Sequence, residues 1–365
     1  MIVKNEQPFL DGCLLSLKGL VDEIVIVDTG STDASIDIAT RHGARVLEHA
    51  WHDDFAAARN VGLEAASGDW ILYIDADERL ADTTHEALRA GLSSPDVVAA
   101  RPLFRVASNR TLYREYRLFR NDPRIRFKGA IHETMRPDLD AIQRETGARI
   151  IDVAATLIHL GYDGDMEAKY RRNLPLLQAA VLRDPDRVYY WNDLAYTLAG
   201  LGEIDEAIAI SDEGLARAEP TDRSSRVLRS MLVHTNARLR AQRGEDVRDL
   251  VEAGLALYPA NWSLRFVRAR ALIDAGQPEA ALADLEALAG QDAAMLCDDH
   301  LGHDQRIFGC YAHDLTGVAL LRLGDRAGAA AAFTRASVAA PDVQEYRVKA
   351  LALGGSAATA GSSAA

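Results

Sequence analysis

The pattern of apolar and polar positions in the first 80 residues predicts alternating strands and helices. Three short apolar runs alternate with two helix-like segments: 23–30 ("EIVIVDTG"), 33–43, 44–50 ("ARVLEHA"), 54–68 and 69–77 ("DWILYIDAD"). Strands joined through helices of this length pair in parallel, because a parallel connection needs about a dozen residues or more. Gly43 and Gly68 follow the two helical segments, where glycine commonly ends a helix. We therefore predict an α/β domain with a mostly parallel, Rossmann-like sheet.

After about residue 160 the pattern becomes helical and rich in Ala and Leu. Residues 189–220 predict two amphipathic helices joined at Gly202, with small residues at Ala195, Ala207 and Gly214 where the helices approach closely. This spacing is typical of a tetratricopeptide repeat, and three weaker copies follow it. We predict the following division: an α/β domain at 1–162, a connecting helix at 163–185, helical repeats at 186–353 and a flexible tail at 354–365.

Composition and charge narrow the possible classes of protein. A length of 365 residues favours two domains, and a formal net charge of -13 disfavours nucleic acid as a partner. No apolar run approaches the ~18 residues that a membrane span needs. The three cysteines are odd in number and far apart, which indicates a reducing compartment, with the cytoplasm as the simplest expectation.

Three carboxylates end the third apolar run, at Asp75, Asp77 and Glu78. In an extended segment Asp75 and Asp77 project to the same side, because side chains alternate with a period of two. Two oxygen donors on one side suit Mg²⁺ or Mn²⁺. The alternative is a polar turn after a strand, with an aspartate capping the next helix, and an isolated D-x-D pattern recurs by chance.

A second polar group follows the first apolar run, in "VDTGSTD". Asp28 ends the predicted strand, and Gly30 and Ser31 lie in the turn, where ligands bind in such sheets. The turn amides and the carboxylate suit a nucleoside or a phosphate, although an ordinary capped turn explains the pattern equally well. Arg59, in "DFAAARN", has a fork of hydrogen-bond donors. These donors suit a diphosphate, or they would hold Asp28 and Asp75 in place. The alternative is a solvated helix arginine.

Six motifs in this order resemble the family 2 glycosyltransferases with a GT-A fold, in the bacterial subgroup that carries a tetratricopeptide domain: "MIVKNE", "VDEIVIVDTGSTD", "DDFAAARN", "GDWILYIDADE", "FKGAIHE" and "IHLGY". The resemblance covers residues 1 to about 185 and extends more loosely into the repeats. It implies transfer of a sugar from a nucleotide-activated donor, with a UDP-sugar favoured. Relatives usually have several residues before the position of Met1, so we expect a shortened first strand or a start further upstream.

The same resemblance implies roles for individual residues. The nucleotide-sugar site is expected to comprise residues from successive motifs: Lys4, Asn5, Glu6, Asp28, Gly30, Ser31, Arg59, Asp75 and Ala76. Asp75, Asp77 and His159 are expected to hold Mn²⁺ or Mg²⁺. A metal suits this chemistry, because breaking a sugar–phosphate bond leaves a diphosphate with growing negative charge that the ion stabilises as a Lewis acid.

An acceptor hydroxyl needs a general base on the opposite face of the sugar. Glu133 in "GAIHE" is our first choice, because Gly129 and Ala130 leave room for a ligand beside it, and His132 is the second. The alternative is that "IHE" merely ends a strand. The family resemblance implies inversion at the sugar carbon, and a single base with no obvious carboxylate nucleophile agrees with it.

Two weaker candidates lie outside these motifs. Cys297, His300 and His303 have spacings that a zinc site uses, although a polar loop between repeats explains them better. Lys169 and Arg172 in "KYRRN" would reach the donor phosphates if this segment lay over the site, but a solvated helix face is the favoured interpretation.

The sequence thus predicts a metal-dependent, inverting glycosyltransferase whose repeats orient a peptide or protein acceptor, with a glycan acceptor next. The repeats would alternatively mediate self-association into a homo-oligomer. One rival is an interaction scaffold with a catalytically inactive sugar-nucleotide domain. A second is a nucleotidyltransferase, but "KNEQPFLDG" lacks the glycine-rich basic phosphate loop expected after the first strand of that class.

Overall fold

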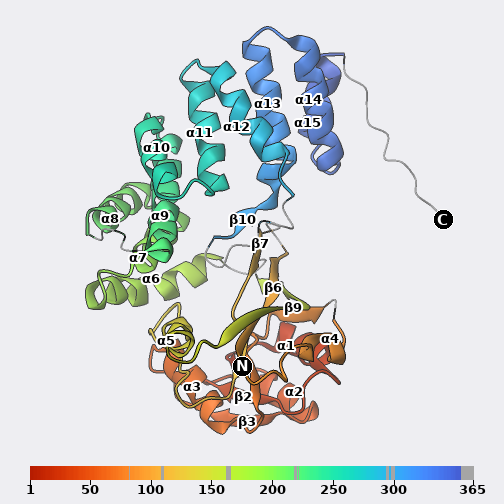
Figure 1. Cartoon of the computed structure of the whole chain (residues 1–365), viewed down its shortest axis with the longest axis vertical. Coiled ribbons are helices and arrows are strands. Elements are labelled where there is room, and N and C mark those ends of the chain that lie inside the picture. The colour runs from red at the N-terminus through yellow and green to blue at the C-terminus, as the bar shows by residue number, and fades with distance from the viewer. Residues whose placement is uncertain are drawn as a thin grey trace, which may run out of the picture. The chain divides into compact units, whose positions relative to one another are not determined.

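The computed structural model describes residues 1–81, 83–107, 111–161, 166–217, 220, 222–292, 296 and 301–354 (Figure 1). The chain forms two compact units, Met1–Asp184 and Pro185–Ala365. The first contains sheets and helices, and the described part of the second is mainly helical, as the sequence pattern predicts. The expected tail falls almost wholly outside the described residues.

A parallel sheet opens the first unit. Its strands β1 (Ile2–Val3), β2 (Val25–Asp28) and β3 (Arg45–Glu48) pair in that order, with Ile2 opposite Val27 and Val25 opposite Arg45. The helices α1 (Gln7–Leu17) and α2 (Ser35–Arg41) connect the strands, and α3 (Phe55–Ala65) follows β3. The predicted alternation of strands and helices is therefore confirmed, with a first strand of two residues.

A mixed sheet completes the first unit. Its long strands, β6 (Val97–Val106) and β9 (Arg149–His159), run parallel, while β7 (Thr111–Arg114) and β8 (Leu118–Arg120) pair antiparallel with β6. The strand β4 (Trp70–Leu72) pairs antiparallel with β8, and β5 (Glu78–Ala81) pairs antiparallel with β9. These antiparallel pairs are not evident in the local sequence pattern.

The predicted strand at 69–77 is too long, because β4 ends at Leu72. Residues 73–77 form a turn that brings the chain into β5. The turn is closed by two hydrogen bonds, since the amide of Glu78 donates to the carbonyl of Asp75 (3.0 Å) and the amide of Asp75 donates to the Glu78 carboxylate (2.9 Å). The polar side chain of Glu78 therefore competes with continued strand pairing.

Helices cover the mixed sheet and follow it. They are α4 (His85–Arg89), α5 (Arg136–Thr146) and α6 (Met166–Arg183). One apolar core lies around Leu10, Ile26 and Leu157, and another around Phe119 and Leu139. These cores fix the strands whose ends carry the polar residues considered below.

The second unit consists of helix pairs and one short strand: α7 (Val188–Gly200), α8 (Ile204–Arg217), α9 (Arg223–Gln242), α10 (Arg248–Leu257), α11 (Trp262–Asp274), α12 (Pro278–Ala289), β10 (His303–Asp304), a 3₁₀ helix (Gln305–Phe308), α13 (Cys310–Arg322), α14 (Arg326–Ala339) and α15 (Gln344–Ala352). Gly202, with φ of 87°, joins α7 to α8 as predicted. A Cβ at Gly214 would lie 2.6 Å from the Cβ of Trp191, so this position requires glycine for the helices to pack. Stacked pairs of this kind are the unit of a tetratricopeptide repeat.

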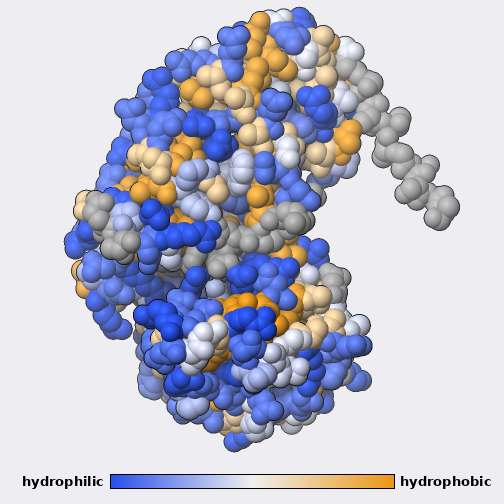
Figure 2. Space-filling view, in the orientation of Figure 1, coloured by the Kyte–Doolittle hydropathy of each residue, from blue (hydrophilic) through white to orange (hydrophobic). Residues whose placement is uncertain are grey.

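Apolar surface is dispersed on the visible face of the molecule, where hydrophilic residues predominate (Figure 2). The most exposed large apolar side chains are Leu182, Val338 and Val348, on α6, α14 and α15. Among the described residues, no helix has the length and the hydrophobicity that would let it cross a lipid bilayer.

Candidate functional site

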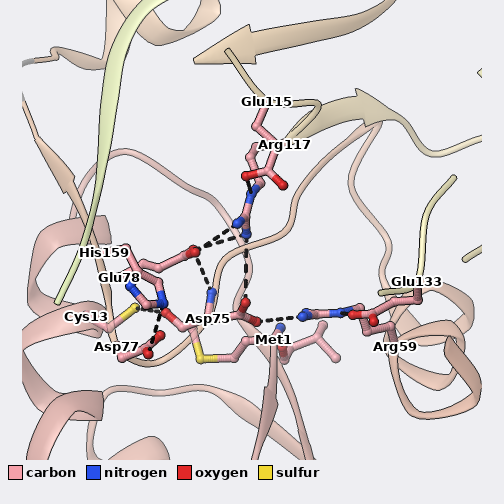
Figure 3. Close-up of polar contacts among 11 residues, drawn as sticks. Met1, Cys13, Arg59, Asp75, Asp77, Glu78, Glu115, Arg117, Glu133 and His159 are labelled. Carbon is pink, nitrogen blue, oxygen red and sulfur yellow. Dashed lines mark hydrogen bonds and ion pairs between the residues drawn. The ribbon is translucent and has the colours of Figure 1, made fainter. Parts of the chain in front are cut away.

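Polar side chains gather where strands of the first unit end. Asp28 ends β2, His159 ends β9, and the turn between β4 and β5 contributes Asp75 and Asp77. Figure 3 shows that Asp77 points to His159, whereas Arg117 contacts both Glu78 and Asp75. Asp75 is also bound by Arg59, so each of the three carboxylates that end the third apolar run lies next to a basic side chain.

Asp28 holds the turn that follows β2. One carboxylate oxygen, Oδ2, accepts from the amides of Gly30 and Ser31, at 3.0 Å each. Gly30 has φ of 108°, which favours glycine. The other oxygen of Asp28, Oδ1, is buried and has no hydrogen-bond partner in the part of the chain that the structure describes. A buried carboxylate oxygen without a donor is costly, so Asp28 is suited to accept a hydrogen bond from a ligand.

The loop after β1 is tied to this turn. The amide of Asn5 donates to the hydroxyl oxygen of Ser31 (3.0 Å), and the amide of Thr32 donates to the side-chain oxygen of Asn5 (2.7 Å). Asn5 adopts a left-handed backbone conformation with φ of 58°. The structure thus uses Asn5 and Ser31 to join two loops, and Lys4 beside them is exposed.

Glu6 adds a carboxyl group close to Asp75 and Asp77. Its amide donates to the hydroxyl oxygen of Ser35 (2.8 Å), which fixes the backbone in front of α1. Burial, together with the charges of Asp77 and Asp75, raises the pKa of Glu6 to about 7. A second anion would be poorly tolerated here unless cations accompanied it.

Arg59 connects the site to the loop that contains the expected base. Its guanidinium binds Asp75 (2.9 Å) through Nη2 and Glu133 through Nε (Figure 3). It also lies against the rings of Tyr73 and Phe127. Burial opposes its charge, but Asp75 and Glu133 raise the pKa of Arg59 above the usual value. Arg59 therefore holds Asp75, as the sequence suggested, and Glu133 instead of Asp28.

Glu78 and Arg117 form a buried ion pair that sequence reasoning missed. Two nitrogens of Arg117 bind the Glu78 carboxylate at 2.8 and 3.1 Å, and Nε binds Glu115 at 2.9 Å. Arg117 also lies over the ring of Tyr73 (4.3 Å). Burial raises the pKa of Glu78, and pairing with Arg117 opposes this shift. No local signal distinguishes Arg117 within "YREYRLFR", because its partner lies 39 residues away.

Asp77 and His159 meet where β5 and β9 pair. The carboxylate of Asp77 lies 3.3 Å from Nε2 of His159, and the amide of Leu160 donates to the carbonyl of Asp77 (2.9 Å). Asp77 occupies the space that a Cβ at Gly161 would need. Burial lowers the pKa of His159, although Asp77 opposes the shift. Neutral imidazole is the form that binds metals.

The expected metal ligands do not come together as a set of three. Within the described ranges, no group of three or more His, Cys, Asp or Glu residues is placed to hold a metal ion. Asp75 is engaged by Arg59 and lies 3.9 Å from Arg117, so its predicted place among the ligands is not supported by this geometry. Asp77 and His159 remain adjacent donors. Mg²⁺ and Mn²⁺ commonly use one or two protein ligands together with phosphate oxygens and water, so this pair fits such an ion.

The "GAIHE" segment is a loop, not the end of a strand. Only an isolated bridge joins Lys128 and Thr134, and the carbonyl of Ala130 accepts from the amide of Phe55 (2.9 Å). His132 has a left-handed conformation with φ of 50°. The loop places Glu133 against Arg59 with 11% of its side chain exposed.

Other predicted residues have more limited roles in this structure. Ala76 is buried, and its carbonyl accepts from Arg79 (3.1 Å). Of the weak zinc candidate, Cys297 and His300 lie outside the described residues, and Nδ1 of His303 contacts the hydroxyl of Ser263 (3.0 Å).

A cavity of about 650 Å³ lies beside Arg59. Its walls include Met1, Trp70, Tyr73 and Phe127. Asp28, Asp77 and His159 are not part of its lining. The cavity therefore lies beside Arg59 and does not include these three strand-end residues.

Residues 1–148 match the family model for glycosyl transferase family 2. A TPR repeat-containing protein of Synechococcus elongatus is 37% identical over 231 residues, which are 60% of this chain and 56% of that protein. The SPbeta prophage-derived glycosyltransferase SunS of Bacillus subtilis is 27% identical over 218 residues, which are 57% of this chain and 50% of that protein. The chain thus spans about half the length of these curated relatives.

Among solved structures, a thermophilic TPR protein of Thermus thermophilus aligns with 51% of this chain and 91% of its own, at 20% identity and a TM-score of 0.35. The family match covers residues 1–148 of the first unit, which include Asp28, Asp75 and Asp77 but not His159. Residues 1–148 are therefore similar to glycosyl transferase family 2, and helix pairs of the tetratricopeptide kind follow them.

Proposed function

We propose that the first unit transfers a sugar from a nucleotide-sugar donor, with a UDP-sugar favoured, to an acceptor. The observation that carries this proposal is the buried oxygen of Asp28 at the end of β2, which has no hydrogen-bond partner among the described residues. A base N–H or a ribose hydroxyl of a nucleotide would supply the missing donor. The family match over residues 1–148 supports the same class of reaction.

Asp77 and His159 are the proposed ligands of Mn²⁺ or Mg²⁺, together with the donor diphosphate. When bound, such an ion supplies Lewis-acid stabilisation of the negative charge on the departing diphosphate. The lowered pKa of His159 keeps its imidazole neutral near pH 7, as a ligand requires. Asp75 has a different part in this proposal, because it positions Arg59 instead of binding the ion.

Glu133 is the proposed base, with His132 as the second candidate. Arg59 binds one oxygen of Glu133, which fixes the carboxylate and leaves the other oxygen for an acceptor hydroxyl. The acceptor oxygen would attack the sugar carbon from the side opposite the diphosphate, while its proton passes to Glu133. Displacement in a single step of this kind inverts the sugar carbon.

The acceptor is proposed to be a peptide or protein oriented by the repeats. Helical repeats present extended surfaces that commonly bind peptides, which supports this choice over a glycan. Self-association through the repeats is the alternative. Light scattering of the full chain, with and without a candidate acceptor peptide, distinguishes a monomer that binds peptide from a homo-oligomer.

Donor binding is tested with Asp28→Asn. Asparagine keeps an oxygen for the amides of Gly30 and Ser31 but places an NH₂ group where the free oxygen lies, so it should repel the ligand's donor. We expect UDP with Mn²⁺ to raise the Tm of the wild type and of Asp37→Asn, an exposed control on α2, but not of Asp28→Asn. If no nucleoside diphosphate or nucleotide sugar raises the wild-type Tm, the proposed function is wrong.

A further inference from the structure

Arg172 on α6 is exposed, as its sequence suggested, but it also makes specific contacts. Although part of its surface is exposed, its guanidinium lies 5.6 Å from the ring centre of Phe55. Its Nε donates to the side-chain oxygen of the neighbouring Asn173 (3.1 Å), which is buried. These contacts hold the charged end of Arg172 over the beginning of α3.

Phe55 places this charge next to the candidate site. It is the first residue of α3 and lies one helical turn before Arg59, so the two side chains project from the same face of the helix. The amide of Phe55 also donates to Ala130 in the loop that contains Glu133 (2.9 Å). Through Phe55, Arg172 is therefore connected to the helix that contains Arg59 and to the loop that contains Glu133.

Glu6 interacts electrostatically with Arg172 and with Asp77. The charge of Arg172 opposes the upward shift in the pKa of Glu6, and burial lowers the pKa of Arg172 while Glu6 opposes that shift. These two described residues interact through their charges without a direct ion pair. Arg172 therefore adds positive charge beside Glu6, which an incoming anion would meet.

Two other cations beside the strand ends, Arg59 and Arg117, are already paired with carboxylates, while the charge of Lys169 acts on His159. Arg59 binds Asp75 and Glu133, and Arg117 binds Glu78 and Glu115. A diphosphate that approached Asp77 would also meet the negative field of Glu6. Among the described residues, Arg172 makes no carboxylate ion pair, so its charge is available to an incoming anion.

We propose that Arg172 binds a phosphate oxygen of the donor diphosphate and stabilises the nucleoside diphosphate as it leaves. This inference rests on the proposed function. In the reaction, the bond between the sugar carbon and the phosphate oxygen breaks, and its electron pair stays on the diphosphate. The acceptor oxygen forms the new bond to the sugar carbon, and its proton goes to Glu133. Arg172 contributes hydrogen bonds and charge, and it exchanges no proton.

Arg172→Gln in the full chain tests the proposal, and Arg171→Gln is the matched control. Arg171 is the adjacent residue of α6 and binds Glu167 (2.6 Å) on an exposed face. Titration calorimetry with UDP and with uridine separates phosphate contacts from nucleoside contacts. We expect Arg172→Gln to weaken UDP binding by about tenfold or more, as loss of a charged hydrogen bond does, and to leave uridine binding unchanged. Arg172→Lys should retain part of the UDP affinity, and Arg171→Gln all of it.

The outcomes distinguish failure of the role of Arg172 from failure of the proposed function. Equal UDP affinity in Arg172→Gln and the wild type overturns the role of Arg172 and leaves the proposed function intact. Equal losses for UDP and uridine also overturn it, because they show a general disturbance of the site. If the wild type binds neither UDP nor any other nucleoside diphosphate, the proposed function fails, and the role of Arg172 fails with it.

Discussion

Replacing Glu78 with glutamine tests how the structure tolerates its clustered carboxylates. The Glu78 side chain is 1% exposed and accepts two hydrogen bonds from Arg117 and one from the amide of Asp75. Glutamine has nearly the same size, but it removes the negative charge and presents an NH₂ group to one of these donors. The buried guanidinium of Arg117 then keeps Glu115 at 2.9 Å and the more distant carboxylate of Asp75 at 3.9 Å.

The expected cost follows from this geometry. Removing one partner of a buried ion pair costs about 3–5 kcal/mol, because the remaining charge is left uncompensated. Since Glu115 still binds Arg117, we expect Glu78→Gln to lower the free energy of unfolding by about 3 kcal/mol, at the low end of that range. Glu115 is 30% exposed, so Glu115→Gln should cost about 1 kcal/mol or less.

Urea unfolding, followed by circular dichroism and tryptophan fluorescence, measures both variants. Adding Arg117→Met to Glu78→Gln should recover much of the lost stability, because it removes the unpaired charge that causes the loss. If Glu78→Gln and Glu115→Gln lower the free energy of unfolding by the same amount, within about 0.5 kcal/mol, Glu78 is not the main buried partner of Arg117. This account of the buried ion pair is then refuted.

Two further predictions concern Glu133, the proposed base, and Glu6, the partly buried carboxyl group beside Asp75 and Asp77. Glu133→Gln should lower kcat for transfer by about 10²- to 10⁴-fold while UDP affinity stays within threefold of the wild type, and unchanged turnover would exclude Glu133 as the base. Because burial raises the folded-state pKa of Glu6 to about 7 from an ordinary value near 4.5, this residue favours folding at low pH and loses that contribution as the pH rises through about 7. Glu6→Gln should therefore raise the Tm more at pH 8 than at pH 5, and an equal change at both values would contradict the shift.

Features set by local spacing could be predicted from the sequence. The parallel order of β1 to β3 follows from alternating runs whose lengths leave room for connecting helices. In the second unit, Gly202 and Gly214 mark the joint and the close contact of α7 with α8. These predictions depend on residues that are near one another in the chain.

Features set by distant partners could not be predicted in this way. The rule that Asp75 and Asp77 project to one side holds only while the backbone stays extended, and Glu78 closes a turn between them. The choice of Arg117 as the partner of Glu78 depends on β8 pairing with β4. Likewise, nothing in "KYRRN" distinguishes the outward Arg171 from Arg172 over Phe55.

The most direct test of the proposed site is Mn²⁺ binding in the presence of UDP, followed by electron paramagnetic resonance. The account predicts that Asp77→Ala and His159→Ala each weaken this binding by tenfold or more, whereas Asp152→Asn, on the exposed part of the same strand as His159, leaves it unchanged. If Asp77→Ala and His159→Ala bind Mn²⁺ with UDP as tightly as the wild type, the ion is not held where β5 and β9 meet, and the proposed site is wrong.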